Sequence, residues 1–369
     1  MIDVLIINGK TVNDEPIEIA IQDGQILEVS SKLTYKSKQT IDLENQSYVS
    51  AGWIDAHTHC FEDLPLYHDS PDKIGYTKGV TTVVDAGTTG AENIGDFYQA
   101  SKDSITNVKA LLNISKTGIV KQSELADMND INEQSVLESV KKYGDFIVGL
   151  KARMSKTVVG ENGILPLKAA KSIQKKAKNL PLMVHIGSAP PLLEEILEWL
   201  EDGDILTHCF NGKENNIMDS HQQIKKSVWD AYDRGIVFDI GHGTDSFNFE
   251  VAEAALKEKM KAHTLSTDIY HRNRENGPVI DFSTTIEKLI VVGYSLQEII
   301  PMITTRPAEM YRLNKKGHLK EQYDADLTIF KVEKNTKMLT DANGNIRNTD
   351  IIVKPTHSII GGSVYGLGG

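Results

Sequence analysis

The chain has 369 residues, of which 40% are hydrophobic and 25% charged, and its formal net charge at pH 7 is −11. These proportions are typical of a globular protein, and the acidic charge argues against a nucleic acid or an anionic membrane as a partner. The residues that follow Met1 lack the basic region of a signal peptide, and no apolar run reaches the length of a membrane span. Two cysteines, Cys60 and Cys209, are too few for a disulfide framework, so we expect a cytoplasmic protein.

Both ends of the chain predict β-structure. The first 50 residues alternate short apolar runs with the turn dipeptides Asn8-Gly9 and Asp23-Gly24. The tail from Gly317 contains three further strand-like runs, at 327–330, 351–353 and 358–364. Because chain termini often lie close together, we predict that residues 1–50 and 317–369 form one small β-domain.

Between these ends, residues 51–316 alternate strand-like and helical segments. The strand-like runs are 53–56, 80–84, 108–112, 146–150, 182–184, 205–206, 236–240 and 264–267. The helical segments are 93–101, 133–142, 166–178, 191–200, 222–233, 249–257, 283–292 and 296–313, with Pro166 and Pro191 expected in first turns. Eight such repeats predict an α/β fold of the (β/α)8 TIM-barrel type. An open doubly wound sheet ranks second, because no Gly-x-Gly-x-x-Gly follows the first strand.

The candidate chemistry begins in the stretch Trp53-Ile54-Asp55-Ala56-His57-Thr58-His59. Residues i and i+2 of a strand point to the same side, so His57 and His59 can direct both imidazoles at one point. Imidazole is the commonest protein ligand of transition metals.

Four more candidate ligands follow at the ends of later strand-like runs: Lys151, His185, His208 and Asp268. Each alone is an ordinary residue. Barrel enzymes place their active sites at the C-terminal ends of the strands, where all six would meet. The set therefore predicts a metal centre on that face.

With these residues in place, the chain resembles the binuclear-metal branch of the amidohydrolase superfamily. Its motifs, including Gly149-Leu150-Lys151 and Ser266-Thr267-Asp268, resemble those of the dihydroorotase-like amidohydrolase/deacetylase group, some of whose members carry an adenine deaminase label. The resemblance implies two divalent ions bridged by a carbamate that Lys151 forms with carbon dioxide. It implies that His57, His59 and Asp268 hold a buried ion, and that His185 and His208 hold a more exposed one. Zinc is the first expectation, although the ligand types also suit manganese, iron or cobalt.

The expected reaction is hydrolysis of an acyl C–N (amide) or C–O (ester) bond in a small molecule. A metal-bridging hydroxide would attack the carbonyl, and Asp268 would carry the proton to the leaving group. Adenine deaminase-type release of ammonia from a purine is the alternative, with Lys151 counting against it. A dihydroorotase-like cyclic amidase ranks lower, because Phe61 occupies the position where such enzymes usually have arginine. A non-catalytic scaffold also ranks lower, because all six ligand positions are filled. The resemblance allows a homo-oligomer.

Five residues near the predicted ligands are candidates for binding substrate. Arg153 follows Lys151 by two residues on the same strand, and His242 lies between two glycines after the seventh run. Tyr270, Gly277 and Pro278 follow Asp268. We interpret Arg272 and Arg274 as solvated loop charges, and Cys60 and Cys209 as packing residues.

Overall fold

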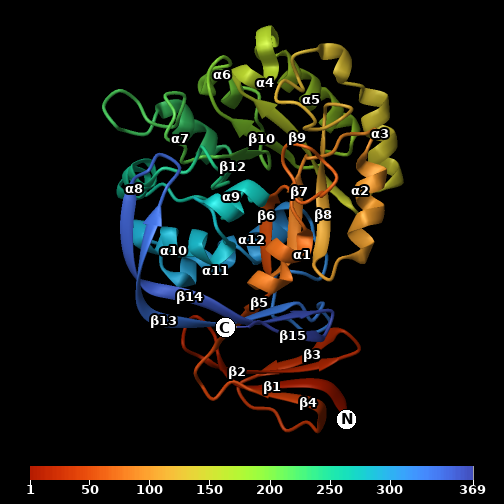
Figure 1. The fold of residues 1–369 in the computed structure, drawn as a ribbon, viewed down its shortest axis with the longest axis vertical. Helices are drawn as coiled ribbons and strands as arrows, with labels where there is room; N and C mark the ends of the chain where they lie inside the picture. Colours follow the sequence, from red (N-terminus) through yellow and green to blue (C-terminus); the bar gives the residue numbers. More distant parts are fainter. Residues whose placement is uncertain (369) are drawn as a thin grey trace.

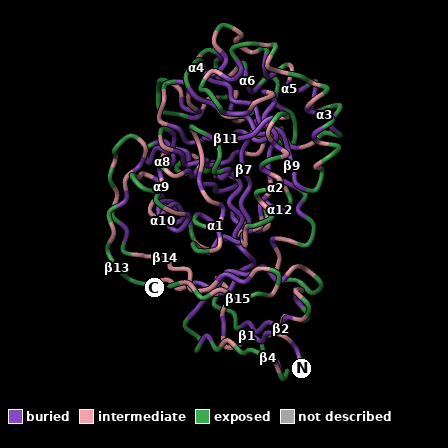
Figure 2. Tube along the Cα trace, turned by 45° about the vertical axis from the view of Figure 1, so that its right-hand side comes forward, coloured by how far each residue is buried: buried purple, intermediate pink, exposed green. Residues whose placement is uncertain are grey.

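The computed structural model describes residues 1–368, which form two β-sheets with helices around one of them (Figure 1). Among these residues, no helix is both long and apolar enough to cross a membrane. The buried residues concentrate inside the helix-covered sheet and between the two sheets, and exposed residues lie on the outer loops (Figure 2).

The first sheet joins the two ends of the chain. Its strands follow the order β15-β14-β13-β5-β1-β2-β3, and β4 pairs with β1. The strands are β1 (Ile2–Lys10), β2 (Pro16–Gln22), β3 (Gln25–Ser30), β4 (Ser37–Asp42), β5 (Tyr48–Ala51), β13 (Leu327–Thr340), β14 (Ile346–Ile360) and β15 (Ser363–Gly366). The antiparallel pair β5–β13 connects the halves, and apolar side chains from both ends, such as Ile19 and Ile329, share one core.

Two details of this sheet differ from the sequence interpretation. Asn8-Gly9 lies inside β1, where the pairing with β2 shifts register and Asn8 adopts a φ of 56°, so this dipeptide makes a bulge and no turn. The strands β13 and β14 are also longer than predicted. They form a hairpin that runs up beside the helices α8 (Phe249–Lys257) and α10 (Phe282–Val292) (Figure 1).

The second sheet is parallel and curled, with its seven strands neighbouring in chain order. They are β6 (Trp53–Thr58), β7 (Val80–Ala86), β8 (Asn107–Asn113), β9 (Ile147–Met154), β10 (Leu182–Ile186), β11 (Ile205–Thr207) and β12 (Val237–Asp239). Every residue of β6, β7 and β9 is buried, as expected for parallel strands covered on both faces. The first seven predicted runs are thus confirmed as strands.

The eighth predicted run does not form a regular strand. Thr264 makes a single parallel bridge to Asp239 at one edge of the sheet, and Ile269 makes another to Thr58 at the opposite edge. Between them, Asp268 has a φ of 51°, which interrupts extended pairing. The segment 264–269 therefore lies between the two edge strands and touches both.

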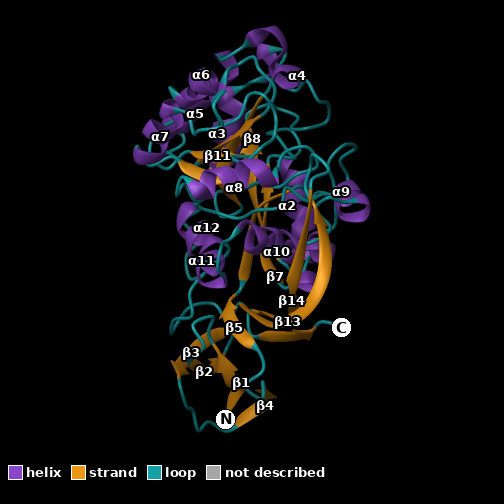
Figure 3. Ribbon diagram, turned by 90° about the vertical axis from the view of Figure 1, so that its left-hand side faces the viewer, coloured by secondary structure: helices purple, strands orange, loops and turns teal. Residues whose placement is uncertain are grey.

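Helices follow most of these strands and lie outside them (Figure 3). They are α1 (Pro71–Ile74), α2 (Ile94–Ala100), α3 (Glu133–Lys142), α4 (Lys156–Val159), α5 (Leu165–Lys176), α6 (Leu193–Leu197), α7 (Lys226–Asp233), α8 (Phe249–Lys257), α9 (His271–Asn276), α10 (Phe282–Val292), α11 (Leu296–Met302) and α12 (Thr305–Met310). Pro166 lies in the first turn of α5 as predicted, whereas Pro191 precedes α6. The predicted helix 296–313 is divided into α11 and α12.

Candidate metal centre

Four of the predicted ligands meet at the C-terminal end of the parallel sheet. One carboxylate oxygen of Asp268 lies 3.3 Å from His57 Nε2 and 3.1 Å from His59 Nε2. The other lies 4.0 Å from His208 Nε2. The donor atoms of His57, His208 and Asp268 all lie within 4.8 Å of one another, so one cation can contact all three.

Two threonine–aspartate pairs orient His57, which lies in β6, and His59, which directly follows that strand. His57 Nδ1 lies 2.9 Å from Thr207 Oγ1, and that hydroxyl donates to Asp239 Oδ2 at 2.8 Å. His59 Nδ1 lies 2.7 Å from Thr88 Oγ1, and that hydroxyl donates to Asp85 Oδ2 at 2.7 Å. Because each hydroxyl gives its proton to a carboxylate, it accepts one from the histidine. The proton therefore sits on Nδ1, and the Nε2 lone pair faces Asp268.

His208 provides the test of whether a metal fits. Its Nδ1 donates to the Gly241 carbonyl oxygen, 2.5 Å away. Its Nε2 is buried and has no hydrogen-bond partner among residues 1–368. A buried, unpaired lone pair is unfavourable unless something binds it. His208 and Asp268 also hold positive φ angles of 67° and 51°, a strain that concentrates at functional sites. These features fit a bound cation.

Lys151 reaches the same point from β9. It is 1% exposed, and its Nζ lies 3.2 Å from His57 Nε2 and 3.1 Å from Met183 Sδ. Burial lowers the pKa of Lys151 to about 7, so much of the amine is neutral near neutral pH. A Cβ at Gly87 would lie 2.6 Å from the Cβ of Lys151, so glycine is required for this side chain to pass.

The sixth predicted ligand, His185, lies at the edge of the group. Its ring packs edge-on against His208 with ring centroids 4.5 Å apart. Burial lowers the pKa of His185 well below its usual value and lowers the pKa of His208 to about 3. Both rings are therefore neutral at physiological pH and have the lone pairs that a metal needs.

Asp268 is a carboxylate in this environment. Burial favours the neutral acid, yet the pKa of Asp268 lies well below its usual value when His57 and His59 carry a proton on Nε2 and contact the carboxylate. A charged carboxylate between histidines can bind a cation and accept a proton.

Arg153 and Tyr270, two of the predicted substrate residues, lie beside this group. Arg153 is 7% exposed, pairs with the buried Glu124 at 3.3 Å, and donates to Gln122 Oε1 at 2.9 Å. Its guanidinium lies 5.7 Å from the ring centre of Tyr67. Tyr67 in turn contacts the rings of Tyr270 and His59, with centroids 4.9 and 5.4 Å away. Arg153 and Tyr270 thus belong to one aromatic and cationic wall beside His59.

His242, Gly277 and Pro278 are placed differently. His242 is fully buried, with Nδ1 2.9 Å from the Gly243 carbonyl oxygen and Nε2 2.8 Å from Lys288 Nζ. Both ring nitrogens therefore already have partners. Gly277 and Pro278 line a separate cavity of about 490 Å³ beneath the β13–β14 hairpin.

Several residues that shape the centre lie outside the sequence prediction. Asp85 and Asp239 are aspartates within or directly after apolar runs, and that position is the only sequence signal for them. Thr88 and Thr207 give no such signal. Arg274 was expected in solvent, but it forms an ion pair with the buried Asp69 at 2.7 Å. Arg272 is exposed as expected, and Cys60 and Cys209 are buried free thiols.

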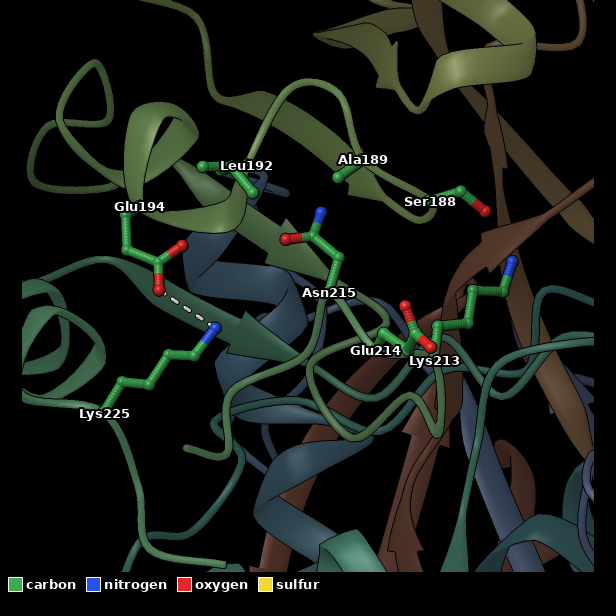
Figure 4. A pocket seen from close by; sticks show the side chains of 8 residues that line it. All are labelled: Ser188, Ala189, Leu192, Glu194, Lys213, Glu214, Asn215 and Lys225. Atoms are coloured by element: carbon green, nitrogen blue, oxygen red, sulfur yellow. Dashed lines mark ion pairs between the residues drawn. The ribbon is translucent and has the colours of Figure 1, made fainter. Parts of the chain in front are cut away.

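A cavity of about 580 Å³ lies where loops follow β10 and β11, the strands that lead to His185 and His208 (Figure 4). Lys225 and Glu194 form an ion pair of 2.9 Å on one side of it, and Asn215 donates to the carbonyl oxygens of Gly187 and Pro191. All eight residues that line it lie outside the predicted site. The candidate centre is therefore identified from its buried donor atoms, and none of its predicted residues lines this cavity.

Comparisons with known proteins agree with the geometry. Residues 319–366 match a family described as a deacetylase-like composite domain. A deacetylase of Enterococcus faecalis is 57% identical over 364 residues, covering 98% of this chain and 99% of that protein. A deacetylase of Agrobacterium fabrum is 35% identical over 359 residues, covering 96% of this chain and 88% of that protein.

Two solved structures are similar over nearly the whole chain, although their names differ. A crystal structure described as that of an adenine deaminase matches with a TM-score of 0.98 and 57% identity, covering 99% of this chain and 100% of that one. One described as a dihydroorotase matches with a TM-score of 0.90 and 34% identity, covering 100% and 99%. The chain belongs to the dihydroorotase-like amidohydrolase/deacetylase group of the amidohydrolase superfamily.

Proposed function

We propose that this protein is a metal-dependent hydrolase that cleaves an acyl C–N or C–O bond of a small molecule. The observation that carries the proposal is the Asp268 carboxylate, which lies within 3.3 Å of two histidine Nε2 atoms and faces the unpaired Nε2 of His208. The names of the relatives, deacetylase and dihydroorotase, support hydrolysis of amide-like bonds.

The fold proposal is a (β/α)8 barrel in which the segment 264–269 takes the place of the eighth strand. Its bridges to Asp239 and Thr58 support this closure. We propose residues 51–316 as the barrel and residues 1–50 with 317–369 as the β-domain, which the mixed sheet supports. A cytoplasmic location, a small-molecule substrate and a homo-oligomer remain part of the proposal.

The residues present would hold two divalent ions, with zinc as the first choice. His57, His59 and Asp268 would bind one ion, His185 and His208 would bind the other, and a carbamate on Lys151 would bridge them. When bound, such ions lower the pKa of water to about 7 and polarise a carbonyl. The carbamate forms when the neutral Lys151 amine adds to carbon dioxide and releases a proton. The lowered pKa of Lys151 and its place beside His57 support this step.

The chain itself supplies proton transfer and orientation. Asp268 accepts the proton that water loses as it attacks the acyl carbon, and it returns that proton to the leaving amine or alcohol. The Thr207–Asp239 and Thr88–Asp85 pairs hold His57 and His59 in the Nδ1-protonated form. We propose that Arg153 and Tyr270 contact the substrate beside His59. Arginine is suited to a substrate carboxylate.

Adenine deamination is the second candidate, because a structure that is 57% identical is described as an adenine deaminase. The buried Lys151 favours acyl hydrolysis over this reaction. Dihydroorotase activity is less well supported, because Phe61 packs against Phe97 with ring centroids 5.0 Å apart and offers no partner for a carboxylate.

A substrate panel tests the proposal. Zinc-loaded protein would be incubated with N-acetyl amino acids, O-acetyl hydroxy acids and adenine, with the variant Asp268→Asn as the matched control. Release of acetate by the wild type, and none by the variant, would support the proposal. Conversion of adenine to hypoxanthine without acetate release would replace it with the deaminase assignment.

A further inference from the structure

Lys288 is a buried lysine outside the predicted site. It lies on α10 and is 0% exposed. Its Nζ lies 2.8 Å from His242 Nε2 and donates to the Pro278 carbonyl oxygen at 2.7 Å. One side chain thus connects the loop 241–243 after β12 with the loop 277–278 that follows α9. Its neighbour Glu287 accepts a hydrogen bond from Lys337 on the hairpin.

The first of these loops contacts two candidate ligands directly. The Gly241 carbonyl oxygen accepts the Nδ1 proton of His208 at 2.5 Å. A Cβ at Gly243 would lie 2.6 Å from Asp268 Oδ2, so the Gly243 backbone packs against that carboxylate. His242 joins these glycines, and its own Nδ1 donates to the Gly243 carbonyl oxygen at 2.9 Å. A shift of the His242 side chain would therefore move the backbone that positions His208 and Asp268.

The second loop is also tied to Asp268. The Asn273 side chain donates to the Asp268 carbonyl oxygen at 2.9 Å and accepts from the Tyr270 N–H at 3.0 Å. Ile280 N–H donates to the Asn273 carbonyl oxygen at 3.1 Å, which links the turn around Pro278 back to this residue. Lys288 thus connects two backbone segments that contact Asp268, one through Gly243 at the carboxylate and one through Asn273 at the main-chain carbonyl oxygen.

Packing alone does not account for a lysine at this position. Burying an ammonium or amine is unfavourable unless its hydrogen bonds are made, and methionine would fill similar space without that penalty. Burial lowers the pKa of Lys288 to about 7. Both the neutral and the charged forms donate to His242 Nε2 and to the Pro278 carbonyl oxygen.

We propose that Lys288 is a positioning residue, which joins the loops 241–243 and 277–278 and so holds His208 and Asp268 in the geometry of the metal centre. This inference rests on the proposed function. Lys288 acts through His242 and Pro278 and does not touch the metal ligands itself.

The test compares Lys288→Met with Lys337→Met. Methionine keeps an unbranched side chain that is one heavy atom shorter, and it removes the donor. Lys337 lines the same cavity but pairs with Glu287 at 2.8 Å and Thr284 at 2.9 Å, and neither of these partners belongs to the two loops. We expect Lys288→Met to lower kcat by roughly 10- to 100-fold, as the loss of an outer-shell partner does, with KM nearly unchanged. We also expect its cobalt-loaded form to show a shifted visible absorption spectrum, and we expect Lys337→Met to match the wild type in both measurements.

A second variant separates hydrogen bonding from packing. Lys288→Ala removes the atoms that n-propylamine contains, and the 490 Å³ cavity gives this amine a route to the site. Added n-propylamine should restore much of kcat and the wild-type cobalt spectrum. The proposal is overturned if Lys288→Met matches Lys337→Met, if the amine restores nothing, or if both Lys288 variants are insoluble, since Lys288 would then serve stability alone.

Failure of the proposed acyl hydrolysis can be distinguished from failure of the positioning role. If the wild type hydrolyses none of the acyl substrates, the cobalt spectra and crystal structures of the wild type and Lys288→Met still report whether the loop 241–243 has moved. An unmoved loop with unchanged spectra rejects the positioning role independently of the reaction.

Discussion

The hydroxyl of Thr207 joins His57 to Asp239, and Thr207→Val removes that link while keeping the shape of the side chain. Thr207 and Asp239 are both 0% exposed, and His57 is 1% exposed. Asp239 keeps two other hydroxyl donors at 2.7 Å, from Thr264 and Ser266. The main loss is therefore at His57 Nδ1, which is left buried without an acceptor.

The size of this effect follows from burial. A buried group without its hydrogen bond destabilises a protein by about 1–3 kcal/mol, and a factor of ten in affinity corresponds to about 1.4 kcal/mol. We expect Thr207→Val to weaken zinc binding roughly 10- to 100-fold. Competition with a chromophoric chelator measures the zinc affinity.

Thr264→Val is the matched control for this prediction. It also removes one hydroxyl from Asp239, yet the Thr264 hydroxyl bonds Asp239 Oδ1, whereas the hydroxyl that bonds His57 belongs to Thr207. We expect its zinc affinity to remain within about threefold of the wild type. Equal zinc affinities in the two variants would refute the idea that the hydroxyl of Thr207 orients His57.

Three further predictions concern the same molecule. Asp268→Asn should abolish turnover while most of the metal stays bound, as measured by kcat together with elemental analysis. Zinc loading in buffer free of carbon dioxide should give less bound metal than loading in bicarbonate, and Lys151→Met should show no such difference. Burial lowers the pKa of His263 from 6.5 to about 4, so the unfolded state binds more protons between these pH values and stability falls as pH drops through this window. His263→Asn keeps an acceptor for the Phe238 N–H. Between pH 7 and pH 4, the variant should lose up to about 3 kcal/mol less free energy of unfolding than the wild type, as measured by urea unfolding at both pH values.

Most of the parallel sheet was predictable because its strands are buried on both faces and read as continuous apolar runs. The prediction of a regular strand at 264–267 was wrong, because the left-handed backbone at Asp268 interrupts extended pairing. The polar helix α9 was missed, since its sequence His271–Asn276 contains no apolar periodicity. The hairpin β13–β14 was predicted too short, because its pairing resumes at Lys337 beyond an irregularity at 335–336, and residues 333–336 face solvent and show no apolar pattern.

The candidate ligands were predictable because the spacing of His57 and His59, and the strand-end positions of the others, follow directly from strand geometry. Their supporting residues were not. Thr207 resembles any residue of a buried strand, and Lys288 lies 46 positions from its partner His242. Such contacts arise from the curled arrangement of the sheet, which brings together elements that no local pattern connects.

Anomalous diffraction at the zinc edge from crystals of zinc-loaded protein tests the central claim most directly. The account predicts two peaks between Asp268 and the four histidines, one within bonding distance of the Nε2 atoms of His57 and His59 and one beside His208. A single peak would show that the centre holds one ion and would contradict the binuclear assignment. An empty site with intact His57, His208 and Asp268 would contradict the assignment of this group as a metal centre.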